Sequence, residues 1–224
     1  MYPSALVRRA VDGRLDVIAI CDHNASENAP HVIEAARDTK LTVLPGMEIT
    51  SREEVHLLAI FDSLPPLQRL QEIIYRHLPG KNDEERFGCQ VIVNARDEVE
   101  GFNERLLIGA TELSLDELVR QVHSLGGIVV ASHIDRESFS VISQLGFIDP
   151  AIPFDAMESS GTAGSAGVRK KYPELAQHPF LESSDAHRIR EIGQRFTEIF
   201  METPTVPELK KAFAGRGGRS IAAS

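Results

Sequence analysis

Histidine and carboxylate side chains recur at the ends of short apolar segments of this chain. The segment LDVIAIC (15–21) is followed by Asp22 and His23, and the segment GGIVVAS (126–132) is followed by His133. Imidazole nitrogen and carboxylate oxygen are the protein ligands of zinc, manganese and iron. Such ions, placed close together, lower the pKa of a bridging water and neutralise a phosphoryl group under attack. The pattern is therefore typical of a hydrolytic metal site.

Two further apolar segments run into residues of the same kind. LTVLPG leads to Glu48, and FLESS leads to Asp185 and His187. His56 differs because it stands near the start of the segment VHLLAIF rather than after it. We expect this imidazole to enter the site from the beginning of a strand or from a short loop.

Each of these side chains also has an ordinary structural explanation. Asp22 can cap the turn that follows it, Glu48 can be an exposed turn acid, His56 a cross-strand filler and His133 a core imidazole. Because the residues recur on successive elements, we favour one shared site over separate explanations. The other histidines lie away from strand ends and are interpreted as structural: His31, His77, His123 and His178.

Two arginines closely follow proposed ligands, Arg136 in SHIDR and Arg188 in DAHR. A guanidinium group matches the geometry of phosphate oxygens, so both are candidates for binding a phosphorylated substrate, with a solvated loop arginine as the alternative for each. Cys21 lies beside His23, but it ends an apolar segment and lacks an orienting partner, which disfavours a nucleophilic thiol.

These side chains need a scaffold that brings strand ends together. The apolar segments are continuous rather than alternating, which is typical of parallel strands covered on both faces. Strands alternating with helices predict a β/α fold whose active-site face is formed by the C-terminal strand ends. The expected strands are 15–21, 41–46, 55–61, 126–132, 154–158, 180–184 and 197–202, and the expected helices are 4–12, 28–39, 66–77, 114–125, about 137–145, 166–177 and 206–215.

The helical pattern is clearest in SLDELVRQVHSLGG, where Ser114 and Glu117 form a candidate capping box. Residues 79–113 break the alternation, because they are polar, charged and long for a connection. We expect them to form an excursion on the surface or over the mouth of the site, with an inert insertion as the alternative. Segment 159–167 is expected to be a loop of small residues, and 215–224 a frayed tail.

Composition narrows the class of protein. The 224 residues suit one domain, and 24 basic against 33 acidic residues give a formal net charge of −9. This charge disfavours long nucleic acids and anionic membranes as partners. The two cysteines lack CxxC spacing, which argues against a disulfide framework and a thiolate zinc site. With no apolar run of membrane-spanning length and no secretion signal, we expect a soluble, cytoplasmic protein.

Four motifs, in the order AICDHN, GMEIT with VHLLAIF, ASHIDR and SSDAHRIREIG, resemble those of the PHP (polymerase and histidinol phosphatase) superfamily of metal-dependent phosphoesterases. The resemblance implies a distorted seven-stranded, TIM-like β/α barrel over residues 1–224. It also implies two or three zinc, manganese or iron ions. A metal-bridged hydroxide would hydrolyse a phosphate ester of a small substrate, with Asp185, His187 and His133 as catalytic residues. By position, the implied metal ligands are His23, Glu48, His56, His133, Asp185 and His187, with Asp22 as a further member of the metal site.

The beginning of the chain departs from this resemblance. The superfamily opens with a strand that carries His-x-His, whereas MYPSALVRRAV is typical of a helix. Without that strand a barrel has unpaired edges and lacks two imidazoles, so we expect the first strand to lie upstream of Met1. If the sequence is complete, the alternative is a catalytically impaired remnant that binds a ligand or partner protein. An amidohydrolase-like metal hydrolase is disfavoured, because no lysine follows a strand as a carboxylated bridging ligand would.

Overall fold

The computed structural model describes residues 1–159 and 164–222. The α-helices are α1 (Pro3–Asp12), α2 (Ala29–Ala35), α3 (Leu64–Arg76), α4 (Glu84–Phe87), α5 (Leu115–Ser124), α6 (Val141–Leu145), α7 (Gly164–Lys171) and α8 (Val206–Phe213). The strands are β1 (Val17–His23), β2 (Thr42–Thr50), β3 (His56–Ile60), β4 (Val91–Val93), β5 (Val99–Phe102), β6 (Ile128–Ala131), β7 (Ala156–Ser159), β8 (Phe180–Glu182), β9 (Ile199–Phe200) and β10 (Ser220–Ile221). Short 3₁₀ turns occupy Pro173–Leu175 and Ile189–Glu191.

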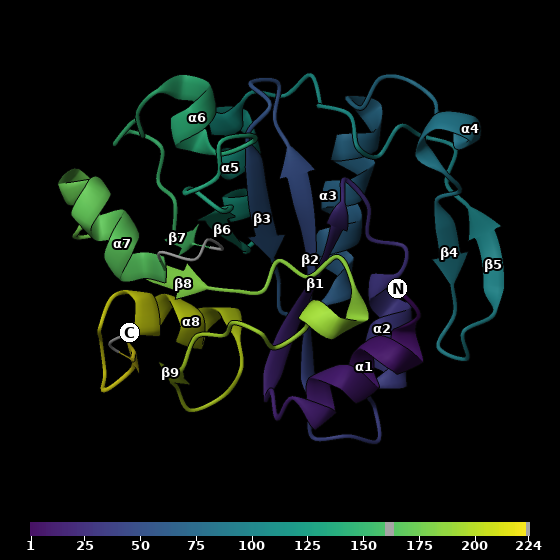
Figure 1. The fold of residues 1–224 in the computed structure, drawn as a ribbon, viewed down its shortest axis with the longest axis horizontal. Helices are drawn as coiled ribbons and strands as arrows, with labels where there is room; N and C mark the ends of the chain where they lie inside the picture. The colour runs from purple at the N-terminus through teal and green to yellow at the C-terminus, as the bar shows by residue number, and fades with distance from the viewer. Residues whose placement is uncertain (160–163, 223–224) are drawn as a thin grey trace.

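Six strands form a curled sheet in the order β1-β2-β3-β6-β7-β8 (Figure 1). β1 and β2 are parallel, as are β6, β7 and β8. Within the described residues, β1 and β8 are the two edges of this sheet and do not pair with each other. The structure is therefore a mixed α/β half-barrel, and the described residues do not form the distorted seven-stranded, TIM-like barrel that the sequence predicts.

The direction of β3 corrects the prediction of an all-parallel sheet. β3 pairs antiparallel with both β2 and β6. Residues 51–55 join β2 to β3 directly, and a parallel crossover needs a connection of about a dozen residues or more. Reversal places His56, the first residue of β3, opposite Thr50 at the C-terminal end of β2. His56 at the start of β3 therefore lies on the same side of the sheet as His23, which ends β1.

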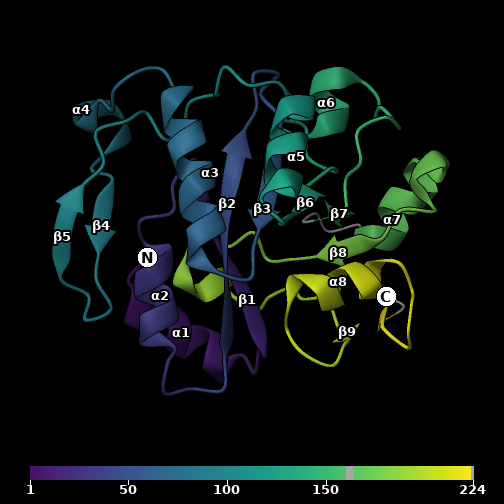
Figure 2. The same cartoon turned by 180° about the vertical axis from the view of Figure 1, so that it is seen from behind.

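Helices cover the outer face of the sheet (Figure 2). α3 begins with prolines in its first turn, which suits their fixed φ and missing N–H. Its Leu67, Leu70 and Ile74 recur at helical spacing and are fully buried in the main core. The predicted capping box of α5 is confirmed, because the Ser114 backbone N–H donates to Glu117 Oε2 over 2.8 Å and the Glu117 backbone N–H donates to Ser114 Oγ over 3.3 Å.

A second, smaller core lies between the sheet and α8. Val206 and Leu209 of α8 pack with Leu44, Ile60 and Ile128 of the sheet. The predicted strand 197–202 precedes this helix, but it does not join the main sheet. Only its residues in β9 are extended, and they pair with β10 in a separate ribbon. The C-terminal segment is therefore ordered into β10, and not frayed as predicted; residues 223–224 lie outside the described residues.

The excursion at 79–113 contains structure that the sequence did not predict. It holds the short helix α4 and the antiparallel hairpin β4–β5, at the far right of Figure 1. The predicted loop 159–167 includes residues 160–163, which lie outside the described residues, and α7 starts directly after them. No helix in the described part of the chain is long and apolar enough to cross a bilayer.

Candidate metal centre

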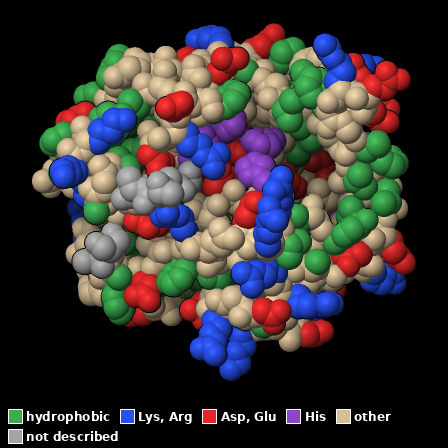
Figure 3. Space-filling view, in the orientation of Figure 1, with side chains coloured by type: hydrophobic (Ala, Val, Ile, Leu, Met, Phe, Trp, Pro, Cys, Tyr) green, Lys and Arg blue, Asp and Glu red, His purple; other side chains and the backbone are tan. Residues whose placement is uncertain are grey.

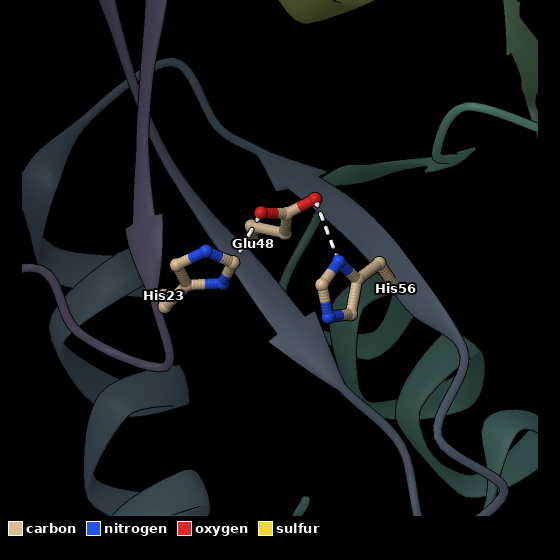
Figure 4. A group of neighbouring side chains, drawn as sticks. All are labelled: His23, Glu48 and His56. Atoms are coloured by element: carbon tan, nitrogen blue, oxygen red, sulfur yellow. Dashed lines mark ion pairs between the residues drawn. The ribbon is translucent and has the colours of Figure 1, made fainter. Parts of the chain in front are cut away.

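His23, Glu48 and His56 lie close together near the C-terminal ends of β1 and β2 and the start of β3 (Figure 4). His23 ends β1 and is the register partner of Glu48 in β2. Glu48 Oε2 lies 3.2 Å from His23 Nδ1, and its Oε1 lies 3.3 Å from His56 Nδ1. One potential ligand atom from each of the three residues lies within 4.8 Å of the other two. This is the spacing of side chains that can share one ion.

His133 extends the cluster from the end of β6. Its Nε2 lies 3.5 Å from Glu48 Oε1 and 3.3 Å from His56 Nδ1. The residue has a φ of 26°, and its backbone N–H donates to Glu158 Oε2 over 3.0 Å. A positive φ is unfavourable for a non-glycine residue, so the backbone of His133 is strained in the conformation that directs its imidazole toward Glu48.

Asp185 and His187 follow β8 and form the opposite wall. The His187 ring lies 6.0 Å from the His23 ring, centroid to centroid, and its Nδ1 lies 3.8 Å from Asp185 Oδ1. Asp185 Oδ2 is paired with Arg136 Nη2 at 2.5 Å. Figure 3 shows histidine side chains gathered in a hollow, with acidic and basic side chains around it. The hollow thus joins residues from both halves of the sheet.

Burial and hydrogen bonding set the charge state of the cluster. Burial by itself raises the pKa of the Glu48 carboxyl, but hydrogen bonds with His133 and His56 outweigh it and hold this pKa well below 4.5. Burial lowers the pKa of His23 below 6.5, against the opposing effect of Glu48. Burial also opposes protonation of His133, yet its hydrogen bond with Glu48 leaves the pKa raised. Glu48 is therefore ionised and His23 neutral near pH 7, which are the forms that bind metal.

The donor set fits a divalent transition metal ion. His23 Nδ1 and His133 Nδ1 are buried, and neither makes a hydrogen bond within the described residues. A buried polar atom without a partner is costly, and an ion or its water would satisfy it. Nitrogen and carboxylate oxygen together suit zinc, manganese or iron. Burial raises the pKa of the Cys21 thiol well above 9.0, so without metal this thiol is protonated near pH 7.

Not every predicted site residue joins the cluster in the same way. Asp22 turns its carboxylate toward Asn28, whose Nδ2 donates to Asp22 Oδ2 over 3.2 Å. Arg136 contacts the cluster indirectly, by its ion pair with Asp185. Arg188 is exposed, and its backbone N–H donates to Glu191 Oε2 over 3.0 Å.

Sequence reasoning missed two features of this site. Glu158 ends the predicted strand 154–158, is buried, and contacts the His133 backbone and the Ser183 hydroxyl. Burial raises the pKa of its carboxyl. The strand-end argument used for the other residues would have found Glu158 as well. The second feature is a cavity between His23 and the β4–β5 hairpin, for which the sequence held no signal.

The curled sheet, with histidines and carboxylates near the ends of its strands, is similar in fold to a predicted PHP-like metal-dependent phosphoesterase and to other solved structures. Solved structures with this fold include the lesion-specific endonuclease PfuEndoQ of Pyrococcus furiosus, with a TM-score of 0.70 and 16% identity over 99% of this chain and 53% of that chain. A candidate metal-dependent phosphoesterase of Bifidobacterium adolescentis has a TM-score of 0.63 and 20% identity, covering 96% of this chain and 91% of that one. In a two-domain protein of Bacteroides vulgatus with a predicted PHP-like phosphoesterase, the likeness has a TM-score of 0.53 at 16% identity, over 96% of this chain and 58% of the other.

At the level of sequence the likenesses are partial. No protein-family model matches the chain. The uncharacterized protein YqxK of Bacillus subtilis (strain 168) is 27% identical over 113 residues, which are 48% of this chain and 29% of YqxK. The chain therefore spans less than a third of YqxK and about half of PfuEndoQ.

One likeness weakens the expectation that long nucleic acids are not partners. A structure of Endonuclease Q with a 27-mer duplex substrate, which carries an abasic lesion at the active site, has a TM-score of 0.71 with this chain at 18% identity. This likeness covers 99% of this chain and 53% of that one. The fold is thus compatible with a duplex substrate, and a net charge counted over the whole sequence does not exclude one.

Proposed function

We propose that this chain is a metal-dependent phosphoesterase that acts on a small phosphorylated substrate. The observation that supports this most directly is the Glu48 carboxylate between His23, His56 and His133, with two buried imidazole nitrogens that make no hydrogen bond in the described part of the chain. A bound ion would satisfy these two nitrogens, which are costly to bury without a partner. The structural neighbours, which include phosphoesterases and an endonuclease, support hydrolysis of phosphate esters.

Two or three divalent ions, zinc, manganese or iron, form the proposed cofactor. When bound, they would lower the pKa of water and neutralise charge on phosphoryl oxygens. His23, Glu48 and His56 are the proposed ligands of one ion, since their ligand atoms are closest together. His133, Asp185 and His187 are the proposed further ligands, and Asp22 stands at the edge of this set.

Residues around the centre have roles that do not require them to be ligands. Arg136 already lies at the cluster through its ion pair with Asp185, so its guanidinium can hold a phosphate oxygen there. Arg188 is exposed near the same turn and is the second proposed clamp. As an alternative to binding metal, the exposed His187 can pass a proton to the leaving oxygen, with the Asp185 backbone carbonyl, 3.0 Å from His187 Nδ1, orienting its ring.

Metal content is the first test of this proposal. The purified chain is incubated with manganese or zinc, desalted and analysed by plasma mass spectrometry, and hydrolysis of p-nitrophenyl phosphate and of bis-p-nitrophenyl phosphate is measured on the same samples. We expect stoichiometric metal and turnover of at least one ester. Both should be lost in His133→Ala.

The control variant is His77→Ala, because His77 lies at the end of α3, outside the cluster, and is half-exposed. It should retain metal and turnover. A folded chain that binds no metal and hydrolyses neither ester would overturn the proposal and favour a binding protein without catalysis. Turnover of an amide or lactone substrate instead of both phosphate esters would point to amidohydrolase-like chemistry.

A further inference from the structure

Glu158 in β7 lies between two turns that carry candidate metal ligands. β7 is the strand between β6 and β8 in the sheet (Figure 1), and His133 follows β6 while Asp185 follows β8. Glu158 is buried, with only 4% of its surface exposed. A carboxyl group is costly to bury unless its oxygens are hydrogen-bonded. The partners of these two oxygens therefore indicate why an acid occupies this position.

Each oxygen of the Glu158 carboxyl group bonds to a different turn. Oε2 accepts from the His133 backbone N–H over 3.0 Å, and Oε1 accepts from the hydroxyl of Ser183, which precedes Asp185 by two residues. The Glu158 backbone carbonyl strengthens the first link, because it accepts from the Ile134 backbone N–H over 2.9 Å. One side chain thus connects the turn after β6 with the turn after β8.

Both turns hold a residue in an unfavourable backbone conformation. The φ angle is 26° at His133 and 42° at Asp185. A positive φ at a residue other than glycine persists only where the surrounding structure enforces it. Without the hydrogen bonds of Glu158, each turn can relax toward ordinary φ values. Such relaxation would redirect the imidazole of His133 and the carboxylate of Asp185.

We propose that Glu158 is a positioning residue that holds the turns of His133 and Asp185 in the arrangement that binds metal. This inference rests on the proposed function, because it concerns ligands of that centre. Each oxygen of Glu158 already has a donor on a ligand-bearing turn, which favours a role in holding other ligands over binding an ion directly.

The metal affinity of folded variants is the first test. Manganese is titrated into the metal-free chain by isothermal titration calorimetry, and circular dichroism verifies that each variant is folded at the temperature used. Glu158→Ala should bind manganese about 10- to 100-fold more weakly than the wild type, as is typical when an outer-shell partner of a metal ligand is lost.

Glu208→Ala is the matched control. Glu208 is a buried carboxylate outside the site, with 6% of its surface exposed, and its two oxygens accept from Lys211 and Arg219. This variant should lose stability and keep its manganese affinity. An equal loss of manganese affinity in Glu158→Ala and Glu208→Ala would reduce Glu158 to a general structural role and overturn the inference.

Glu158→Gln separates positioning from direct metal binding. The amide oxygen can accept from the His133 backbone N–H while the amide NH₂ donates to the Ser183 hydroxyl, which accepts as well as donates. Both links are kept, so manganese affinity should remain close to that of the wild type. A loss as large as that of Glu158→Ala would assign Glu158 as a ligand and overturn the positioning role. If Glu158→Ala does not fold, Ser183→Ala cuts one link and should show a smaller loss.

The His133 ring gives a readout that needs no metal. Its Cε1–Hε1 signal in proton–carbon NMR, assigned through His133→Ala, should shift in Glu158→Ala, return toward its wild-type position in Glu158→Gln and stay unchanged in Glu208→Ala. An unchanged signal with unchanged manganese affinity in Glu158→Ala would overturn this inference and leave the proposed function intact. A wild-type chain that binds no manganese would overturn both, and the wild-type titration by itself identifies that case.

Discussion

At the scale of single residues, Glu48 combines burial with ionisation. A buried carboxylate is normally destabilised, but here both oxygens face imidazole nitrogens at 3.2–3.5 Å. The same carboxylate contacts three histidines that reach it from three strands or strand ends. Glu48 therefore controls both the charge of the cluster and the position of its ligand atoms.

Replacing Glu48 should remove metal binding. Glu48→Gln keeps the shape of the side chain but supplies a neutral amide, so one charged ligand is lost. Changing an outer-shell partner of a metal ligand typically costs about 10- to 100-fold in metal affinity or activity, and we expect a loss of about 100-fold or more here. Metal stoichiometry and ester turnover measure it. Unchanged metal affinity would show that Glu48 is not a ligand.

The pKa shifts predict how stability depends on pH. The pKa of Glu48 is lowered, so its stabilising contribution is present above 4.5 and is lost as the pH falls through its folded value. The pKa of His133 is raised, so its contribution is present below 6.5 and is lost as the pH rises through its folded value. Thermal unfolding of the metal-free chain should therefore show Tm falling as the pH is raised above 6.5.

Bound metal should reverse the fall of Tm that we expect above pH 6.5. Ions bind neutral imidazole, so raising the pH favours the bound, folded form. With saturating manganese, Tm should rise over the same pH interval in which the metal-free Tm falls. Parallel profiles with and without manganese would contradict the proposed linkage.

At the scale of elements, the site depends on how segments are joined. The antiparallel β3 brings His56 beside His23 and Glu48, and Asn24 binds residues of the excursion next to them. Asn24 is fully buried with a φ of 48°; its Nδ2 donates to the carbonyls of Leu107 and Gly109, each over 2.8 Å. Asparagine suits this place because it tolerates positive φ and offers two donors.

Removing the hydrogen bonds that Asn24 donates to the excursion should destabilise the fold. Asn24→Ala leaves the partly buried carbonyls of Leu107 and Gly109 without their side-chain donor and removes a residue type that tolerates positive φ, so we expect a loss of about 2–4 kcal/mol in the free energy of unfolding. Urea unfolding measures the loss, and hydrogen exchange of residues 105–110 locates it. Asn82→Ala should lose less than about 1 kcal/mol, because Asn82 bonds within the excursion only. Equal losses would contradict the assignment.

At the scale of the whole molecule, the sheet is a half-barrel with two edges in the described residues. Half-exposed residues dominate β1, whereas β2 is buried along most of its length. The whole sequence has a formal charge of −9, and the centre itself contains Glu48 and Asp185 together with Arg136 and four histidines.

The edges should be the least protected strands. Amides of β1 that point away from β2 have no strand partner in the described structure, whereas β2 has a partner on each side. Hydrogen–deuterium exchange should be at least about tenfold faster for peptides within 17–23 than for peptides within 42–50. Equal protection would mean that another chain segment or a second copy covers the β1 edge.

The sequence by itself predicted that histidine and carboxylate side chains lie near strand ends, an α/β fold like that of solved PHP-like structures, and the α5 capping box. These are local properties, because apolar runs, caps and the residues after a strand are contiguous. It also placed an excursion at 79–113 without its hairpin, whose strands are too short to carry a recognisable period.

Only the tertiary structure decided the direction of β3, the Arg136–Asp185 pair, the turning of Asp22 toward Asn28 and the cavity beside His23. A continuous apolar segment reports that a strand is buried on both faces, and it does not report in which direction the strand runs. Pairs such as Arg136 and Asp185 depend on how distant segments pack, since long side chains have several partners within reach. The cavity arises where the hairpin meets β1, so its chemistry exists only after folding.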